Sequence, residues 1–107
     1  MGVSEPLIQT SLLGEAIEHA PVAVFVADEH GAFVAVNQSA CTMLGYERGE
    51  LLAMSVGEIS HGEPAEDGDP GVKHATLTRS DGTTVAFSYS TGETTVAGMS
   101  VFVHVGR

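Results

Sequence analysis

Two short apolar runs and a helix start follow one another within residues 22–52, and this order most constrains the fold. The runs at residues 22–27 and 32–36 are rich in β-branched side chains, which favour strands. The residues from Asp28 to Gly31, which separate the runs, have the composition of a tight turn in which a glycine takes positive φ. The sequence therefore predicts a β-hairpin here.

A short helix is predicted directly after the second strand. Asn37 stands where its side-chain oxygen can accept a hydrogen bond from a free N–H group of the first helical turn. Ala40, Cys41 and Leu44 then fall on one stripe, and Gly45 occupies a position at which helices commonly end. Hairpin and capped helix thus follow one another without a long linker.

Further helices are predicted on both sides of this region. Residues 1–20 contain an amphipathic helix, and its apolar stripe must be buried against another apolar surface. A single helical turn is predicted at residues 47–52, held loosely because Glu47 is a weak cap and Gly49 disfavours helix. Residues 54–59 are predicted to form another short helical piece.

The C-terminal third is predicted to be β-structure. Residues 72–80, 83–91 and 96–105 are rich in Val, Thr, Phe and Tyr, with turns predicted at Asp81-Gly82 and at Gly92-Glu93. Residues 61–71, in contrast, contain two prolines, three glycines and four acidic residues, so they are predicted to form a loop.

Composition limits the classes of function. A chain of 107 residues with one cysteine is predicted to be one domain without an internal disulfide. The formal net charge of −10 would repel phosphate backbones and anionic membranes, so direct binding to nucleic acid or membrane is not expected. The sequence has neither an apolar run near the ~20 residues of a membrane span nor a signal-peptide pattern, which favours a cytoplasmic location.

The ordered motifs resemble those of PAS domains, the small sensor modules of bacterial signalling proteins. The resemblance covers roughly residues 10–105 and rests on residue types at family-like spacing: Asp28, Gly31, Asn37, Ala40, Gly45-Tyr46, Glu50-Leu51 and the turn Arg79-Ser80-Asp81-Gly82. It implies an α+β fold with a five-stranded antiparallel sheet in the order 2-1-5-4-3 and short helices on one face. Residues 1–20 would be the N-terminal flanking helix and residues 21–107 the PAS-like domain.

The same resemblance implies a sensory or interaction domain of a bacterial signal-transduction protein, for example in two-component regulation. Such a domain senses a small ligand or relays a signal through dimerisation to an effector domain, which this chain does not include. In PAS domains the flanking helix covers the outer face of the sheet or pairs with its copy in a second subunit, and the two arrangements remain open here. The homodimer contacts would be Leu7, Ile8, Leu12, Leu13 and Ile17.

Two alternatives to ligand sensing remain. One is a purely structural dimerisation module with a filled core, and the other is a small enzyme of similar α+β outline. No nucleophile motif, phosphate-binding loop or metal-ligand spacing is present, so no catalytic or metal-binding residue is predicted. A small apolar ligand would lie between helices and sheet, with a predicted lining of Val24, Val26, Ala40, Cys41, Leu44, Leu52, Met54, Ile59, Leu77, Met99 and Val101.

Haem and flavin are not expected, and no other cofactor is assigned. Cys41 lies on the inner stripe of the helix that follows Asn37, which is not the sequence context of the flavin-reactive cysteine in PAS relatives. The chain also has no tryptophan to stack on a flavin. His61 is the nearest candidate for a haem ligand, but it stands in the predicted loop, where nothing would aim its imidazole rigidly.

Overall fold

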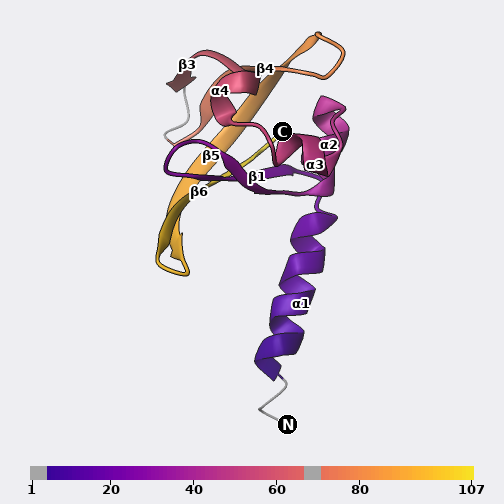
Figure 1. Cartoon of the computed structure of the whole chain (residues 1–107), viewed down its shortest axis with the longest axis vertical. Coiled ribbons are helices and arrows are strands. Elements are labelled where there is room, and N and C mark those ends of the chain that lie inside the picture. The colour runs from indigo at the N-terminus through magenta and orange to yellow at the C-terminus, as the bar shows by residue number, and fades with distance from the viewer. Residues whose placement is uncertain (1–4, 67–70) are drawn as a thin grey trace.

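A curled, six-stranded antiparallel sheet forms the body of the protein in the computed structural model, which describes residues 5–66 and 71–107 (Figure 1). The strand order is β2-β1-β6-β5-β4-β3. The elements in chain order are α1 (Glu5–Glu18), β1 (Ala23–Asp28), β2 (Phe33–Val36), α2 (Gln38–Leu44), α3 (Arg48–Leu51), α4 (Val56–Ile59), β3 (Ser60–Glu66), β4 (Lys73–Thr78), β5 (Thr84–Val96) and β6 (Met99–Gly106).

The predicted fold class is confirmed, and five of the six strands lie in the predicted order. The prediction of a loop at residues 61–71 is wrong for residues 61–66, which form most of β3, while residues 67–70 lie outside the described part of the chain. β3 pairs with β4 only, and its register shifts between His61 and Ala65. An edge strand with such an irregularity tolerates Gly62 and Pro64, because one side of its backbone needs no partner.

The turn between the last two strands also differs from the prediction. β5 runs through Gly92 and Glu93, and the chain reverses instead at Ala97 and Gly98, whose φ angles are 51° and 79°. Positive φ at both central residues is the mark of a type I′ hairpin turn, whose twist matches that of paired strands. The resulting β5–β6 hairpin extends past the rest of the sheet (Figure 1).

The first hairpin and the helix after it form as their sequences predict. In the turn, the Asp28 carboxylate accepts hydrogen bonds from the backbone N–H groups of His30 and Ala32 at 2.9 and 3.0 Å. At the end of α2, Gly45 has a φ of 75° and donates its N–H to the carbonyl of Cys41 at 2.8 Å. Gly31 in this turn and Gly45 at the helix end therefore both take the left-handed conformation, since Gly31 has a φ of 84°.

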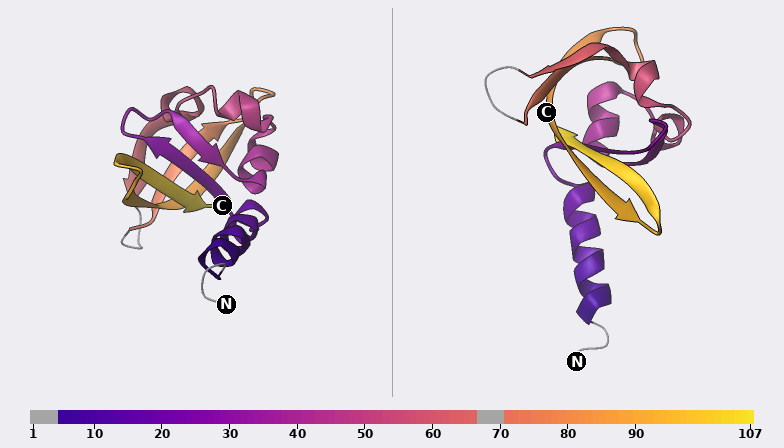
Figure 2. Two further views of the ribbon diagram at one scale, coloured as in Figure 1. Left: turned by 60° about the horizontal axis from the view of Figure 1, so that its bottom comes forward. Right: turned by 90° about the vertical axis from the view of Figure 1, so that its left-hand side faces the viewer.

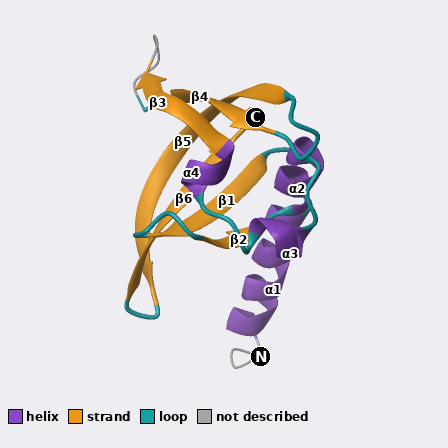
Figure 3. Cartoon of the chain, turned by 45° about the horizontal axis from the view of Figure 1, so that its top comes forward, coloured by secondary structure: helices purple, strands orange, loops and turns teal. Residues whose placement is uncertain are grey.

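The start of α3 is better held than its sequence predicts. The Glu50 carboxylate accepts a hydrogen bond from the backbone N–H of Glu47 at 2.9 Å, so a residue inside the helix supplies the polar partner that a weak cap lacks. Leu51, at the end of the same helix, is fully buried. Helices α2, α3 and α4 lie against the concave side of the sheet (Figures 2 and 3).

Helix α1 stands apart from this body and meets it only near its C-terminal end (Figures 1 and 2). Leu12 and Leu13 are each 62% exposed, and Ile17 is 50% exposed. Leu7 and Ile8, two further predicted contacts, lie outside the residues whose side chains are described. No helix within the described ranges is long and apolar enough to cross a membrane.

Candidate ligand cavity

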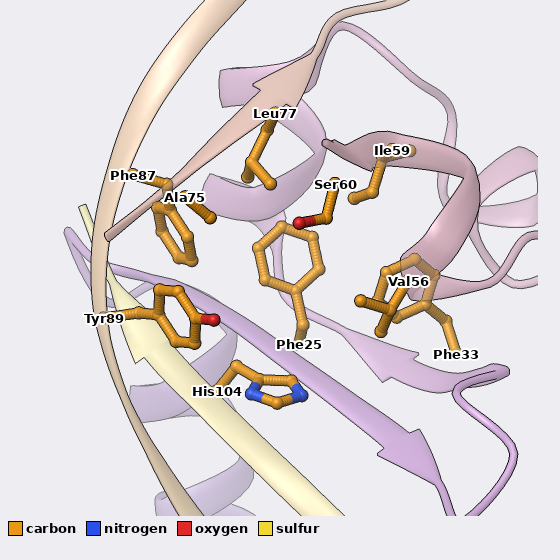
Figure 4. A pocket seen from close by; sticks show the side chains of 10 residues that line it. All are labelled: Phe25, Phe33, Val56, Ile59, Ser60, Ala75, Leu77, Phe87, Tyr89 and His104. Atoms are coloured by element: carbon orange, nitrogen blue, oxygen red, sulfur yellow. The ribbon is translucent and has the colours of Figure 1, made fainter. Parts of the chain in front are cut away.

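A cavity of about 40 Å³ lies between the concave face of the sheet and helix α4 (Figure 4). Every strand from β1 to β6 contributes to it, and aromatic side chains dominate its walls. The lining residues are Phe25, Phe33, Val56, Ile59, Ser60, Ala75, Leu77, Phe87, Tyr89 and His104. Strand pairing brings them together, because residues directly opposite each other in an antiparallel pair share one face of the sheet.

Five rings form a continuous chain around this cavity. The ring of Phe25 lies 5.4 Å from that of Phe33 and 5.7 Å from that of Phe87, with an edge-to-face geometry in the second pair. Phe87 stacks on Tyr89 at 5.2 Å, and Tyr89 meets the His104 ring edge-to-face at 5.7 Å. Such contacts stabilise the walls beyond the burial of apolar area alone, so the cavity has a well-defined shape.

Polar groups occupy the cavity at two places. In Figure 4 the hydroxyl oxygens of Ser60 and Tyr89 both point toward the ring of Phe25, in the middle of the cavity. His104 lies beside Tyr89, and its Nδ1 is 2.9 Å from the hydroxyl of Thr91, which fixes the orientation of the imidazole. The cavity is therefore apolar with a few directed hydrogen-bonding groups, the composition typical of small-molecule sites.

Burial sets the protonation states of two of these groups. It raises the pKa of the Tyr89 hydroxyl above its ordinary value of 10.0, so this hydroxyl keeps its proton at neutral pH. Burial also lowers the pKa of His104 below 6.5, and the positive charge of Lys73 adds to this effect. At neutral pH the described walls of the cavity thus carry no charge.

The structure places the predicted lining residues in several environments. Ile59 and Leu77 line the cavity itself. Ala40 and Leu44 are fully buried behind it, in the same apolar cluster as the aromatic rings, and Met54 packs against that cluster. Cys41 belongs to the cluster too, and burial raises the pKa of its thiol above the ordinary value, which leaves it protonated and unreactive at neutral pH.

The other predicted lining residues do not reach the cavity. Val24 and Val26 alternate with Phe25 along β1 and therefore face the opposite side of the sheet, where they line a groove beside α1. Val101 is buried, but it pairs with Asp28 on that same opposite side. Leu52 and Met99 are 41% and 45% exposed.

Sequence reasoning missed eight of the ten lining residues, and a usable signal was present for part of them. In the strand that became β5, Val85, Phe87 and Tyr89 share one face, and two of these three line the cavity. Choosing the face of β1 and β6 that carries Phe25 and His104 would have added these two, so four of the eight could have been found. The alternation alone does not tell which face is concave, because both faces of β1 and β6 contain apolar side chains.

Asn37 forms a second notable site, at the junction of α1, β1 and α2. Its side chain is 3% exposed and makes four hydrogen bonds. The Oδ1 atom accepts from the N–H groups of Val24 and Ala40 at 2.9 and 3.1 Å, and Nδ2 donates to the carbonyls of Ile17 and Val22 at 2.8 and 2.9 Å. Asn37 therefore caps α2, as predicted, and also ties the end of α1 to the sheet.

Two further polar contacts hold the same end of α1. The Ser39 hydroxyl donates a hydrogen bond to the Ala20 carbonyl at 2.5 Å, and Arg48 of α3 forms an ion pair with Glu18. All three contacts come from residues at or next to α2 and α3. The direction of α1 is thus fixed by α2 and α3, whose Leu44 and Leu51 belong to the apolar cluster behind the cavity.

The cavity does not fit haem or flavin. Its volume of about 40 Å³ is far below the ~300–1,000 Å³ of pockets that hold drug-sized ligands. A larger depression of about 380 Å³ lies beside α2 and α3, but mostly exposed residues such as Gln38, Thr42 and Glu47 line it. It is open surface, and we do not regard it as a ligand site.

Comparison with known proteins identifies the fold family. The model of the PAS fold matches residues 12–99, which is most of the chain. The chain belongs to the PAS family. No protein with a curated description matches this PAS domain significantly.

Solved PAS domains share its fold over nearly their whole length. A PAS domain of an HTR-like protein from Haloarcula marismortui has a TM-score of 0.78 at 24% identity, with 97% of this chain and 95% of that chain covered. A PAS domain from a two-component sensor histidine kinase reaches 0.80 at 17% identity, with 95% and 97% covered. A domain of a sensory box sensor histidine kinase/response regulator from Geobacter sulfurreducens reaches 0.75 at 22% identity, with 99% of each chain covered.

Proposed function

We propose that this PAS domain is the sensory part of a bacterial signalling protein and that it senses a small ligand in the aromatic cavity. The observation that carries the proposal is the cavity itself, a hollow that is partly open to solvent and whose walls are almost entirely apolar. Its ring-lined walls and directed hydroxyl groups have the composition of a ligand site. Two of the structural neighbours come from sensor histidine kinases, which supports the signalling role.

The signal leaves the cavity through α2 and Asn37. Ala40 and Leu44 of α2 pack in the same cluster as Phe25 and Phe87, so a ligand that packs against these rings changes the contacts of the cluster that holds α2. The N–H of Ala40 donates to Asn37, whose amide holds the carbonyl of Ile17 in α1. A shift of α2 would therefore change the direction of α1.

The receiver of the signal is a second copy of the chain together with an effector domain. The apolar side chains that α1 exposes, Leu12, Leu13 and Ile17, supply a homodimer contact that the domain does not cover itself. A change in the direction of α1 would alter that contact and pass to the effector of the parent protein. We place the domain in the cytoplasm and assign it a binding role without catalysis.

The second candidate function is a dimerisation module in which the cavity stays empty. The exposed stripe on α1 favours it, and the small volume of the cavity is compatible with it. The two candidates differ in one physical property, which is whether a foreign molecule enters the cavity.

Xenon tests this property without assuming any ligand chemistry, because it binds apolar cavities. We would record ¹H–¹⁵N NMR spectra of the full chain under increasing xenon pressure. We expect saturable shifts at the amides of Phe25, Leu77, Phe87 and Tyr89. The variant Ala75→Leu, which fills the cavity, should lose them, and the variant Ala35→Leu, on the groove side of the sheet, should keep them. Shifts that never saturate, or that persist in Ala75→Leu, would favour the dimerisation module.

A further inference from the structure

The chemistry of the cavity limits the ligand, and the following inference rests on the proposed sensory function. Size is the first limit. One buried water needs roughly 10–15 Å³ of such space, so a volume of about 40 Å³ holds about three water-sized groups. The part of a ligand that lies inside the hollow without rearrangement of the five rings therefore has about three or four non-hydrogen atoms.

Hydrogen bonding is the second limit. The hydroxyls of Ser60 and Tyr89 both point into the cavity. Among the described residues neither has a hydrogen-bond partner and neither oxygen is fully buried, so both can bond to water or to a ligand. The Tyr89 hydroxyl remains protonated at neutral pH and is a donor. A carbonyl oxygen has two lone pairs and no proton, so it can accept from both hydroxyls at once.

Charge is the third limit. Among the residues whose side chains are described, which leave out residues 62–70, no Asp, Glu, Lys or Arg lines the cavity, and burial lowers the pKa of His104 so that it is neutral at neutral pH. Lys73 pairs with Tyr89 across β4 and β5 and so shares its face, but its side chain is not part of the wall. An ionised ligand would lose its hydration without gaining a counter-ion inside the cavity, which strongly disfavours it.

We propose that the cavity binds a small, neutral carbonyl compound, such as a short ketone or aldehyde, with its oxygen between Ser60 and Tyr89 and its alkyl groups against the aromatic rings. Ligands of four non-hydrogen atoms have a low affinity ceiling, at a Kd of roughly 10⁻⁵–10⁻⁴ M for the best cases. The domain would thus respond to such compounds at micromolar to millimolar concentrations.

Three probes of four non-hydrogen atoms each test the assignment by ¹H–¹⁵N NMR titration of the full chain at neutral pH. They are acetone, acetate and acetamide, and cyclohexanone serves as an oversized ketone. We expect acetone to give saturable shifts at the amides of Ser60, Leu77, Phe87 and Tyr89. Acetate should give no such shifts, and cyclohexanone should not enter the cavity. Acetamide should bind more weakly than acetone, because the proposed site supplies no acceptor for its amino group.

Two variants separate hydrogen bonding from packing. Tyr89→Phe keeps the ring and removes the donor, so acetone affinity should fall about five- to tenfold while xenon binding is retained. Lys73→Met removes the cation that pairs with Tyr89 across β4 and β5, and it should leave acetone affinity unchanged. The amide spectrum of each free variant reports whether its fold is intact.

The outcomes distinguish this inference from the sensory function on which it rests. If acetate binds more tightly than acetone, the ligand is not a neutral carbonyl compound, although the cavity remains a ligand site. Loss of acetate binding in Lys73→Met would strengthen that conclusion. Equal acetone affinity in the wild type and Tyr89→Phe would overturn the assigned hydrogen bond. Absence of acetone binding where xenon still enters would also reject the carbonyl assignment, whereas exclusion of xenon as well would reject the sensory function.

Discussion

The side-chain amide of Asn37 donates a hydrogen bond to the backbone carbonyl of Ile17, with 2.8 Å between nitrogen and oxygen. This contact joins a buried residue of the domain to the last turn of a helix that otherwise projects into solvent (Figure 1). The other three hydrogen bonds of the same side chain go to β1, to the residue before it and to α2. Asn37 therefore links α2, the sheet and α1.

Replacement of Asn37 by Ala should destabilise the domain more than loss of a helix cap alone. The cap costs about 1 kcal/mol, and buried groups left without a partner cost about 1–3 kcal/mol more, so we expect a loss of about 2–4 kcal/mol in the free energy of unfolding. Urea denaturation measures it. The neighbouring exposed residue provides the control, since Gln38→Ala removes only a contact with Thr42 and should stay within ~0.5 kcal/mol of wild type.

Gly106 and Gly92 form a matched pair of strand glycines with opposite expectations. A Cβ atom at Gly106 would lie 2.1 Å from the carbonyl oxygen of Ser88 and 2.7 Å from Cα of Tyr89, so backbone must move. Gly106→Ala should cost about 1–3 kcal/mol. At Gly92 nothing lies within 4 Å of the added atom, and Gly92→Ala should be neutral or stabilise by up to ~1 kcal/mol. Equal thermal stability of the two variants would contradict the β5–β6 pairing described here.

Because of His104, the free energy of unfolding should decrease as the pH is lowered from neutral. Burial and the charge of Lys73 lower its pKa in the folded state, so between that pKa and the ordinary value of 6.5 the unfolded chain binds more protons. Its contribution is fully present above pH 6.5 and is lost progressively as pH falls below that value. Urea denaturation at several pH values from about 5 to 8 measures the slope.

The variant His104→Phe separates this group from the other four histidines of the chain. It keeps an aromatic ring beside Tyr89 and cannot titrate, so its stability should depend less steeply on pH than that of the wild type. Hydrogen bonds from Thr83 lower the pKa of Asp81 below its ordinary value of 3.8. Asp81 therefore does not titrate in the pH range of this experiment. Parallel pH profiles of wild type and variant would show that His104 has no such role.

The exposed stripe of α1 should determine the oligomeric state. Leu13→Glu places a charge in the proposed homodimer contact and should shift the chain toward monomer, by tenfold or more in the dimer dissociation constant. Ser11→Glu adds the same charge to another exposed position of the helix and should change the dimer dissociation constant less. Sedimentation equilibrium over a concentration series measures both. A wild-type chain that remains monomeric at every concentration would exclude the α1 homodimer.

The sequence predicted the elements whose geometry depends on local chemistry. The turn at Gly31, the Asn37 cap and the end of α2 at Gly45 each require a particular residue type, so each could be recognised from it. The order of five strands came from the PAS resemblance, and the structure confirms it.

The features that the sequence did not predict depend on tertiary context. The segment that contains Gly62 and Pro64 has a loop-like composition, and only its place at the sheet edge makes it a strand. Gly92 and Glu93 resemble a turn, yet cross-strand pairing with Val103 and Phe102 continues the hairpin beyond them. The cavity was assigned in part to the wrong face of β1 because both faces carry apolar residues, and the curl of the sheet decides which one is concave.

The most direct test of the proposed sensing route is the NMR signal of the Asn37 side-chain amide protons while xenon fills the cavity. Asn37 does not line the cavity, so a shift at these protons must arrive through the surrounding packing. We expect them to shift with the same saturation curve as the amide of Phe87 in the wild type, and to stay unchanged in Ala75→Leu. A saturated shift at Phe87 with no change at the Asn37 side chain would contradict a connection between the cavity and α1.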